Sequence, residues 1–139
     1  MVTYVLDSSA VLRLLLKEPG ADRIKSILED LSRGTANVMV SAIHWGEVVG
    51  KIYKAHGKDA ADQLPLRFLP LGVEVVPATL IRAAQAGAIK ADTKIPYADA
   101  FGVELALDSP DHILVTADFD FKPAESRIRI EFLPPKPKP

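Results

Sequence analysis

The stretch Val2-Thr3-Tyr4-Val5-Leu6-Asp7-Ser8-Ser9 decides the fold that we expect for this chain. Its first five residues are β-branched, aromatic or aliphatic, which is typical of a buried strand. The acid and the two serines that follow are typical of the turn into a helix. A second apolar run covers residues 112–116 and is followed closely by another acid, Asp118. Such continuous apolar runs predict strands that are covered on both faces, as in a parallel sheet.

Strand-like and helix-like segments alternate along the rest of the chain. We expect strands at residues 2–6, 37–40, 73–76, 112–116 and 127–133. The last is expected at an edge of the sheet, because polar and apolar residues alternate in it. We expect helices at residues 10–16, 21–33, 42–56, 78–91 and 97–107, and one bent or broken helix over residues 58–72. This alternation predicts an α/β fold, namely a three-layer α/β/α sandwich around a parallel five-stranded sheet.

The 139 residues suffice for one domain, which we expect at residues 1–133, with a flexible tail rich in proline and lysine at residues 134–139. The chain has no cysteine, which excludes thiolate nucleophiles and cysteine-rich zinc sites. Its net charge of -1 excludes a broad basic surface for nucleic acid. No basic segment precedes the first apolar run, and no apolar run approaches the roughly 20 residues of a spanning helix. We therefore expect a soluble, cytoplasmic protein without a membrane partner.

Four acids stand at corresponding places along the chain. Asp7 and Asp118 follow the first and fourth predicted strands, Glu47 lies early in the helix after the second strand, and Asp99 opens another helix. Ligands of parallel α/β sheets bind beyond the carboxyl ends of the strands. We therefore expect all four carboxylates to reach one hollow at that edge.

Each acid also has a purely structural interpretation. Asp7 could cap the helix that follows, although the neighbouring Ser8 could cap it instead and leave the carboxylate free. Asp99 could be favoured by the helix dipole. Asp118 could form a turn, although Asp120 could be that turn residue.

Glu47 has a structural interpretation of its own, a surface ion pair with Lys51 four residues later. Gly46 and Gly50 favour a functional interpretation, because glycine inside a helix costs about 1 kcal/mol relative to alanine. Two such residues beside one acid predict that something approaches the helix backbone closely there.

Several carboxylates at one edge repel one another unless a proton or a cation neutralises them. Ligation by carboxylate oxygens, without histidine or cysteine, selects hard ions such as Mg²⁺ or Mn²⁺. Such ions act mostly on phosphates, as in metal-dependent nucleases. We do not expect His44, His56 or His112 to be metal ligands.

Four motifs, in order, resemble the PIN-domain family, and the resemblance covers essentially the whole chain. Each motif alone is weak, but four of them at family-like intervals are specific. The motifs are Tyr4-Val5-Leu6-Asp7-Ser8-Ser9-Ala10, Ser41-Ala42-Ile43-His44-Trp45-Gly46-Glu47-Val48, Tyr97-Ala98-Asp99-Ala100-Phe101 and Leu114-Val115-Thr116-Ala117-Asp118-Phe119-Asp120-Phe121. The chain resembles in particular the VapC-type toxins of toxin–antitoxin pairs, which are small single PIN domains that cleave RNA.

This resemblance implies a function and a set of site residues. It implies a ribonuclease whose Mg²⁺ or Mn²⁺ is held by four acids, a homodimer, and a small VapB-type antitoxin whose C-terminal segment covers or enters the acidic groove. The acids that match the family's site are Asp7, Glu47, Asp99 and Asp118. Supporting positions that match are Ser8 or Ser9 beside the first acid, Thr116 and Asp120. The proline- and lysine-rich tail is not part of the family pattern.

Two alternatives remain open at this point. A phospho-acceptor domain of the response-regulator type also has an acid cluster, but Val76-Pro77-Ala78 stands where its acceptor aspartate is needed. A PIN-like protein without catalysis would only bind RNA or a partner protein. The sequence shows no nucleophile elbow, P-loop or dinucleotide glycine motif. Five lysines near the acidic motifs are candidates for contacts with RNA phosphates: Lys51, Lys54, Lys90, Lys94 and Lys122.

Overall fold

The computed structural model of the chain describes residues 1–138 and contains a five-stranded parallel sheet with the strand order β3-β2-β1-β4-β5. The strands are β1 (Thr3–Leu6), β2 (Asn37–Ser41), β3 (Glu74–Val76), β4 (His112–Thr116) and β5 (Arg129–Phe132). The expected α/β fold with a parallel five-stranded sheet is confirmed, and β5 lies at an edge as its alternating pattern predicts.

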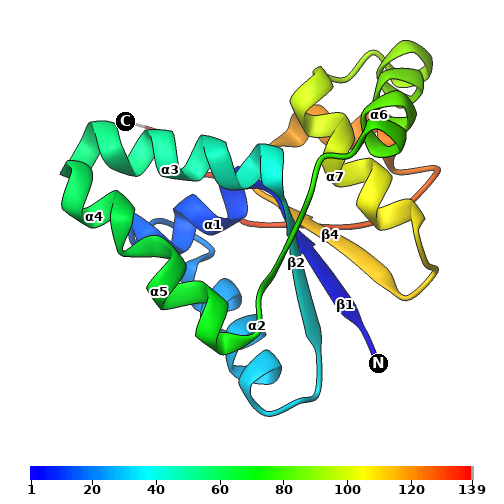
Figure 1. Ribbon diagram of the computed structural model, residues 1–139. Helices are drawn as coiled ribbons and strands as arrows, with labels where there is room; N and C mark the ends of the chain where they lie inside the picture. The colour runs from blue at the N-terminus through cyan, green and yellow to red at the C-terminus, as the bar shows by residue number, and fades with distance from the viewer. Residues whose placement is uncertain (139) are drawn as a thin grey trace.

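Helices cover both faces of the sheet (Figure 1). The helices are α1 (Ser8–Leu15), α2 (Ala21–Ser32), α3 (Ala42–His56), α4 (Lys58–Asp62), α5 (Leu64–Phe68), α6 (Leu80–Thr93) and α7 (Tyr97–Leu107), with 3-10 turns η1 (Leu69–Leu71) and η2 (Phe119–Ala124). The first five helices pack mainly on one face, and α6 and α7 pack on the other. No helix within residues 1–138 is long and apolar enough to cross a membrane.

The alternation of side chains along β1 divides the core in two. Tyr4 and Leu6 point into the cluster beneath α1, α2 and α3, whereas Val5 points into the cluster beneath α6 and α7. All three side chains are buried, which explains why the strand is apolar at every position rather than at every second one.

The helical segments predicted at 58–72 and 78–91 differ from the structure for identifiable reasons. The segment 58–72 forms α4, α5 and η1, and Pro65 and Pro70 lie in the first turns of α5 and η1, where a missing N–H is tolerated. The helix predicted at 78–91 begins at Leu80 instead, because the Thr79 side chain accepts a hydrogen bond from the Arg82 N–H and caps it.

The strand order creates the place where a ligand is expected. The chain moves from β1 outward to β3, then returns to place β4 on the other side of β1. The carboxyl ends of β1 and β4 therefore flank the point where the winding reverses, which is where ligands bind in open α/β sheets. Response-regulator domains have the order 2-1-3-4-5, with the third strand inside the sheet. Here β3 is an edge strand, so that alternative is wrong.

Candidate active site

Asp7 lies directly after β1 and is 2% exposed. One carboxylate oxygen, Oδ1, accepts hydrogen bonds from the Ser9 hydroxyl (2.7 Å) and the Ala10 N–H (2.9 Å). The other, Oδ2, accepts one from the Thr116 hydroxyl (2.6 Å). A carboxylate has about four acceptor positions. These bonds leave one position on Oδ2 for a further ligand.

Asp7, and not Ser8, caps α1. The Ala10 N–H bonds to Asp7, and Ser8 instead donates a hydrogen bond to Glu47 Oε1 (3.1 Å) on α3. The expectation that Ser8 would cap the helix and leave Asp7 free is therefore wrong. The Ser8 hydroxyl instead links the first acidic motif to the second through Glu47.

Ser9 and Thr116 join the ends of β1 and β4. Besides bonding to Asp7, the Ser9 hydroxyl accepts from the Ala117 N–H (2.9 Å), and the Thr116 hydroxyl accepts from the Asp118 N–H (2.9 Å). Each hydroxyl thus donates to Asp7 and accepts from the backbone after β4. This exchange of hydrogen bonds fixes the position of Asp118 relative to Asp7.

Asp118 begins η2, and its Oδ1 accepts a hydrogen bond from the Asp120 N–H (2.9 Å). Asp118 is therefore the turn-forming residue, and the suggestion that Asp120 takes this place is wrong. Asp120 is exposed at the rim of the site. The Asp118 carboxylate is half-buried and still has a second oxygen available.

Glu47 is half-exposed in α3, and its Oε1 lies 3.9 Å from Nε2 of His44. The ion pair with Lys51 that would explain Glu47 structurally is absent among the ion pairs of residues 1–138. His44 is fully buried, and burial lowers its pKa, so the ring is neutral at physiological pH. His44 was not predicted from sequence as a neighbour of Glu47. The signal for it is the three-residue spacing, which places the side chains of His44 and Glu47 on the same side of α3.

The glycines beside Glu47 do not contact another part of the chain. A Cβ atom added at Gly46 or Gly50 would meet nothing within 4 Å. The predicted close approach is therefore not made within residues 1–138. By contrast, a Cβ atom at Gly102, on the helix of Asp99, would lie 3.2 Å from His44 Cε1 and 3.3 Å from Leu114 Cδ1. Glycine at that position lets α7 pack closely on the sheet.

The electrostatics bring Asp99 into the same site. The pKa of Asp99 is raised to about 7, mainly by burial and then by the charges of Asp118, Asp7, Glu47 and Asp120, in that order. Burial also raises the pKa of Asp7 to about 6, against the effect of its hydrogen bonds, and Asp118 adds to the increase. Negative charge is therefore costly at this edge of the sheet, and a cation would be favoured.

Hydrogen bonds connect seven of the eight predicted site residues: Asp7, Ser9, Thr116, Asp118 and Asp120 in one group, and Ser8 with Glu47 in another. Asp120 takes part only through its backbone N–H, and Asp99 interacts with the other acids through its charge. Within the described part of the chain, no three acidic or histidine side chains lie close enough to hold an ion jointly. The donor set itself is of carboxylate oxygens, which fits Mg²⁺ or Mn²⁺ and does not fit zinc.

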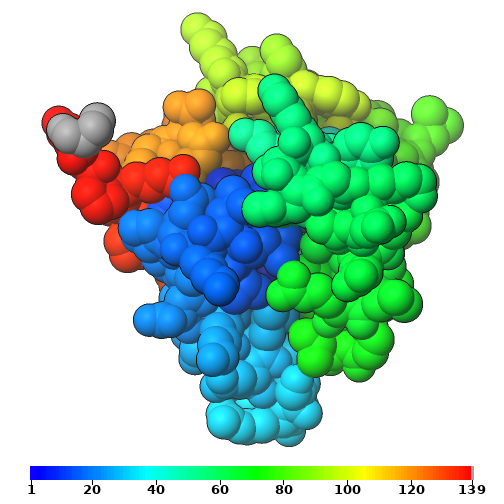
Figure 2. Space-filling model, turned by 90° about the vertical axis from the view of Figure 1, so that its left-hand side faces the viewer, coloured from blue at the N-terminus to red at the C-terminus, as the bar shows by residue number. Residues whose placement is uncertain are grey.

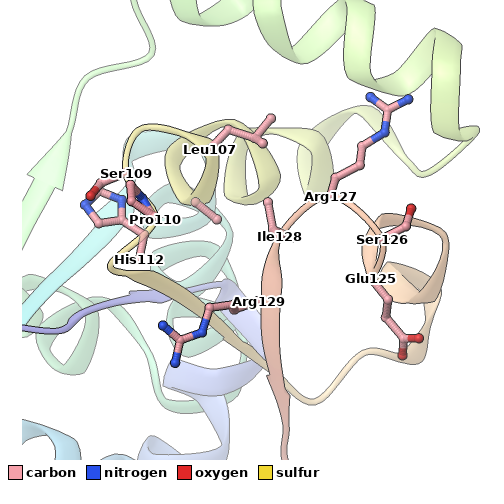
Figure 3. Close-up of a pocket in the computed structure, with 10 residues that line it drawn as sticks. Leu107, Ser109, Pro110, His112, Glu125, Ser126, Arg127, Ile128 and Arg129 are labelled. Carbon is pink, nitrogen blue, oxygen red and sulfur yellow. The ribbon is translucent and has the colours of Figure 1, made fainter.

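The exposed surface of α1 lies between α3 and the segment after β4, whereas β1 itself is buried. In Figure 2 the surface of α1 is blue and is flanked by the teal surface of α3 and the orange surface of η2. A separate hollow lies at the opposite end of β4 and β5 (Figure 3), away from every predicted site residue. Its lining includes Leu107, His112, Glu125, Arg127 and Arg129.

The fold is shared with toxin–antitoxin proteins of known structure. A DNA-bound VapBC from Salmonella typhimurium matches with a TM-score of 0.68 and 20% identity over 95% of this chain and 98% of the other. FitAcB from Neisseria gonorrhoeae matches with a TM-score of 0.67 and 22% identity over 91% and 95%. VapC20 from Mycobacterium tuberculosis, a sarcin–ricin loop cleaving toxin, matches with a TM-score of 0.66 and 17% identity over 94% and 99%.

These identities are low, so the structural likeness establishes the fold alone. No curated protein matches the chain significantly. The sequence itself matches the model of the PIN domain over residues 4–125. This match begins in β1 and includes all four predicted acids as well as Ser8, Ser9, Thr116 and Asp120. It covers most of the chain and agrees with the sheet and the acidic edge, and we conclude that this chain belongs to the PIN-domain family.

Proposed function

We propose that this protein is a Mg²⁺- or Mn²⁺-dependent endoribonuclease and the VapC-type toxin of a toxin–antitoxin pair. The observation that carries the proposal is the meeting of the PIN acidic motifs at the carboxyl ends of β1 and β4, where Asp7 and Asp118 share Thr116 and Asp99 experiences their charge. Neighbouring carboxylates whose charges repel one another favour a cation, and a cation held by carboxylates is the centre of metal-dependent nucleases.

Asp7, Glu47, Asp99 and Asp118 would hold the cation. A divalent cation at such a site lowers the pKa of a bound water and neutralises charge that develops on a phosphodiester. Hydrogen bonds from Ser9, Thr116 and the Ala10 N–H stabilise the ionised form of Asp7 and fix its orientation.

Hydrogen bonds also orient Glu47 and Asp118, the other two of these proposed cation ligands that accept side-chain hydrogen bonds. The Ser8 hydroxyl orients Glu47, and the neutral His44 beside it supplies no competing positive charge. The Asp118 carboxylate is fixed by the Asp120 N–H. From the PIN resemblance we infer cleavage that leaves a 5′-phosphate and a 3′-hydroxyl.

Partners are proposed from the same family relationship. The matched structures include VapBC complexes from Salmonella typhimurium and Rickettsia felis, both bound to DNA. We propose that this chain likewise pairs with a VapB-type antitoxin and forms a homodimer. We propose RNA as the substrate, because one matched structure, VapC20, is a toxin that cleaves the sarcin–ricin loop, which is a segment of RNA.

Cleavage of a cellular RNA pool by purified protein tests the proposal. We expect discrete fragments with Mg²⁺ or Mn²⁺, and none with EDTA or with Asp99→Asn, which keeps the side-chain shape and removes a charge. Asp111→Asn is the matched control, because Asp111 is exposed before β4, at the opposite edge of the sheet. Full activity of Asp99→Asn with metal would overturn the metal-site assignment.

A non-catalytic PIN-like RNA-binding protein is the second candidate. The observation that favours it is that no three acidic or histidine side chains of residues 1–138 lie at the distances needed to share an ion. A folded protein that binds RNA, leaves the whole RNA pool uncut and does not bind Mn²⁺ would establish this second candidate instead.

A further inference from the structure

A hollow on the exposed side of α3 adjoins Glu47 and has no role in the fold. It is lined by Glu47, Gly50, Lys51, Lys54 and Ala55. We propose that this hollow, called the α3 groove below, binds the sugar–phosphate backbone of the RNA strand next to the bond that is cut. The inference rests on the proposed function and extends it, because it assigns residues that bind substrate without taking part in the chemistry.

The two lysines of the α3 groove are available to phosphates. Lys51 and Lys54 are exposed, and neither takes part in an ion pair or a side-chain hydrogen bond within residues 1–138. In contrast, Lys58 on the next helix is paired with Asp62. Residues three apart lie on the same side of a helix, so both ammonium groups can contact one strand.

Gly50 leaves the floor of the groove open. A Cβ atom at this position would meet nothing within 4 Å, and the same holds for Gly46 one turn earlier. Glycine inside a helix lowers stability, and packing does not explain its presence here. The methylene groups of Lys51 and Lys54 beside the bare helix offer apolar walls to a ribose, while the charged ends remain in water.

The position of Glu47 connects the groove to the chemistry. Glu47 is both a wall of the groove and a partner of Ser8, which follows Asp7. A strand that lies along Lys54 and Lys51 therefore reaches the acidic edge at Glu47. The net charge of -1 supplies no general attraction for RNA, so local cations beside the acids are needed to offset their repulsion of phosphate.

The first test measures RNA binding without cleavage. A short fluorescein-labelled single-stranded RNA is titrated by fluorescence anisotropy in the Asp99→Asn background with Mg²⁺, with and without Lys51→Gln and Lys54→Gln together. Loss of two phosphate contacts should weaken binding about tenfold at 0.1 M salt and reduce the slope of log K against log salt by about 1.4. The matched control changes the exposed Lys17 and Lys25 to Gln, which removes equal charge at a different hollow.

A second test measures the Tm and the RNA affinity of the same variant, and we expect the Tm to rise and the RNA affinity to fall. Gly50→Gln fills the groove but should raise the Tm, because it removes a helical glycine without a clash. We expect it to weaken RNA binding severalfold. Gly87→Gln on α6 is the control, since a Cβ there also meets nothing within 4 Å. It should raise the Tm and leave RNA binding unchanged.

The outcomes separate this inference from the proposed function. If wild-type protein cuts RNA with Mn²⁺ but the lysine and Gly50 variants bind and cut RNA like wild type, the α3 groove is not the RNA site and the nuclease assignment stands. If RNA binding depends on Lys51 and Lys54 but the wild-type protein does not cut RNA with Mg²⁺ or Mn²⁺, the groove is supported and the catalytic assignment fails. An equal loss in the Lys17 and Lys25 control would overturn the groove, because it would show a general charge effect only.

Discussion

Asp7 has two tasks at the end of β1, because it caps α1 and belongs to the acidic edge. Its three hydrogen bonds come from Ser9, Ala10 and Thr116, and they offset part of the cost of burying its charge. Another residue can often replace an N-cap, but here the hydrogen bond from the Ala10 N–H also orients the Asp7 carboxylate, which is a candidate metal ligand. The sequence pattern identified Asp7 but did not decide whether Asp7 or Ser8 caps α1, because Asp and Ser are equally good N-cap residues.

Thr116→Val should destabilise the protein by about 1–3 kcal/mol, since the change leaves a buried carboxylate oxygen and the Asp118 N–H without their shared partner. Urea unfolding at pH 8 measures this effect. Thr35→Val is the control, because Thr35 is exposed and its hydroxyl bonds only to the Asp30 carbonyl. Equal free energies of unfolding for wild type and Thr116→Val would show that this hydroxyl does not support Asp7.

The raised pKa values of Asp7 and Asp99 predict how stability depends on pH. Their pKa values are about 6 and about 7 in the folded chain, against 3.8 for an ordinary aspartate. Between these values the folded state holds protons that the unfolded state has released. Stability without metal should therefore fall as the pH rises from about 4 to about 7.

Thermal unfolding in EDTA at pH 5 and pH 8 tests this dependence. We expect a lower Tm at pH 8 for wild type and a smaller difference for Asp99→Asn, with Asp111→Asn behaving like wild type. A wild-type Tm that rises between pH 5 and pH 8, unchanged by Asp99→Asn, would contradict the assigned repulsion between the acids.

Among the helices and strands, α3, α7 and β4 have the bounds predicted from sequence, and β1 differs by one residue. The apolar run of β1 is buried on both faces, and Ser41 caps α3 as its position before the apolar pattern indicates. The start of α6 was predicted two residues early, because proline and threonine both fit a helix entry and only the observed Thr79 cap decides between them.

Arg13 was not singled out from sequence, because a basic residue in an apolar helix looks like a surface position. In the structure it is 7% exposed, and its Nη1 donates to the carbonyls of Pro19 (2.6 Å) and Pro134 (2.8 Å). It thereby joins the end of α1 to the segment after β5. The bond from Arg13 to Pro134 joins residues that are far apart in the chain, so the sequence around Arg13 does not predict it.

Arg13→Met should cost about 2–4 kcal/mol of unfolding free energy, because two buried carbonyls lose a charged donor. Denaturant unfolding measures this cost. Arg33→Met is a suitable comparison, since Arg33 is exposed and makes only the long surface contacts of 4.0 and 3.7 Å to Glu29 and Asp30. A loss of the same size in both variants would contradict the anchoring role of Arg13.

At the scale of the whole molecule, the sequence predicted the layers but not the strand order. Alternating strands and helices require a parallel sheet, yet several orders satisfy the same hydrophobic pattern. The observed order places β3 at an edge and the carboxyl ends of β1 and β4 side by side. The order therefore explains why Asp7 and Asp118, which are more than a hundred residues apart in the chain, lie at the ends of neighbouring strands.

The places of the four acids after strands or early in helices could be predicted from the sequence pattern, whereas their hydrogen-bond partners could not. Ser8 with Glu47, and His44 beside them, depend on how α3 packs across α1. The close approach predicted at Gly46 and Gly50 is not made by the described residues, because a Cβ atom added at either position would meet nothing within 4 Å. The sequence alone does not say whether such an approach would be made by the chain itself or by a bound molecule.

We infer that Asp7, Glu47, Asp99 and Asp118 act together on one divalent-cation site, and calorimetric titration with Mn²⁺ at pH 8 tests this inference. We predict saturable binding by wild type and by Asp111→Asn, and affinity at least about tenfold lower for Asp99→Asn. Repeating the wild-type titration at pH 5 should show weaker binding, because protons then compete at Asp7 and Asp99. The same Mn²⁺ affinity in wild type and Asp99→Asn, or no binding by folded wild type, would contradict the claim.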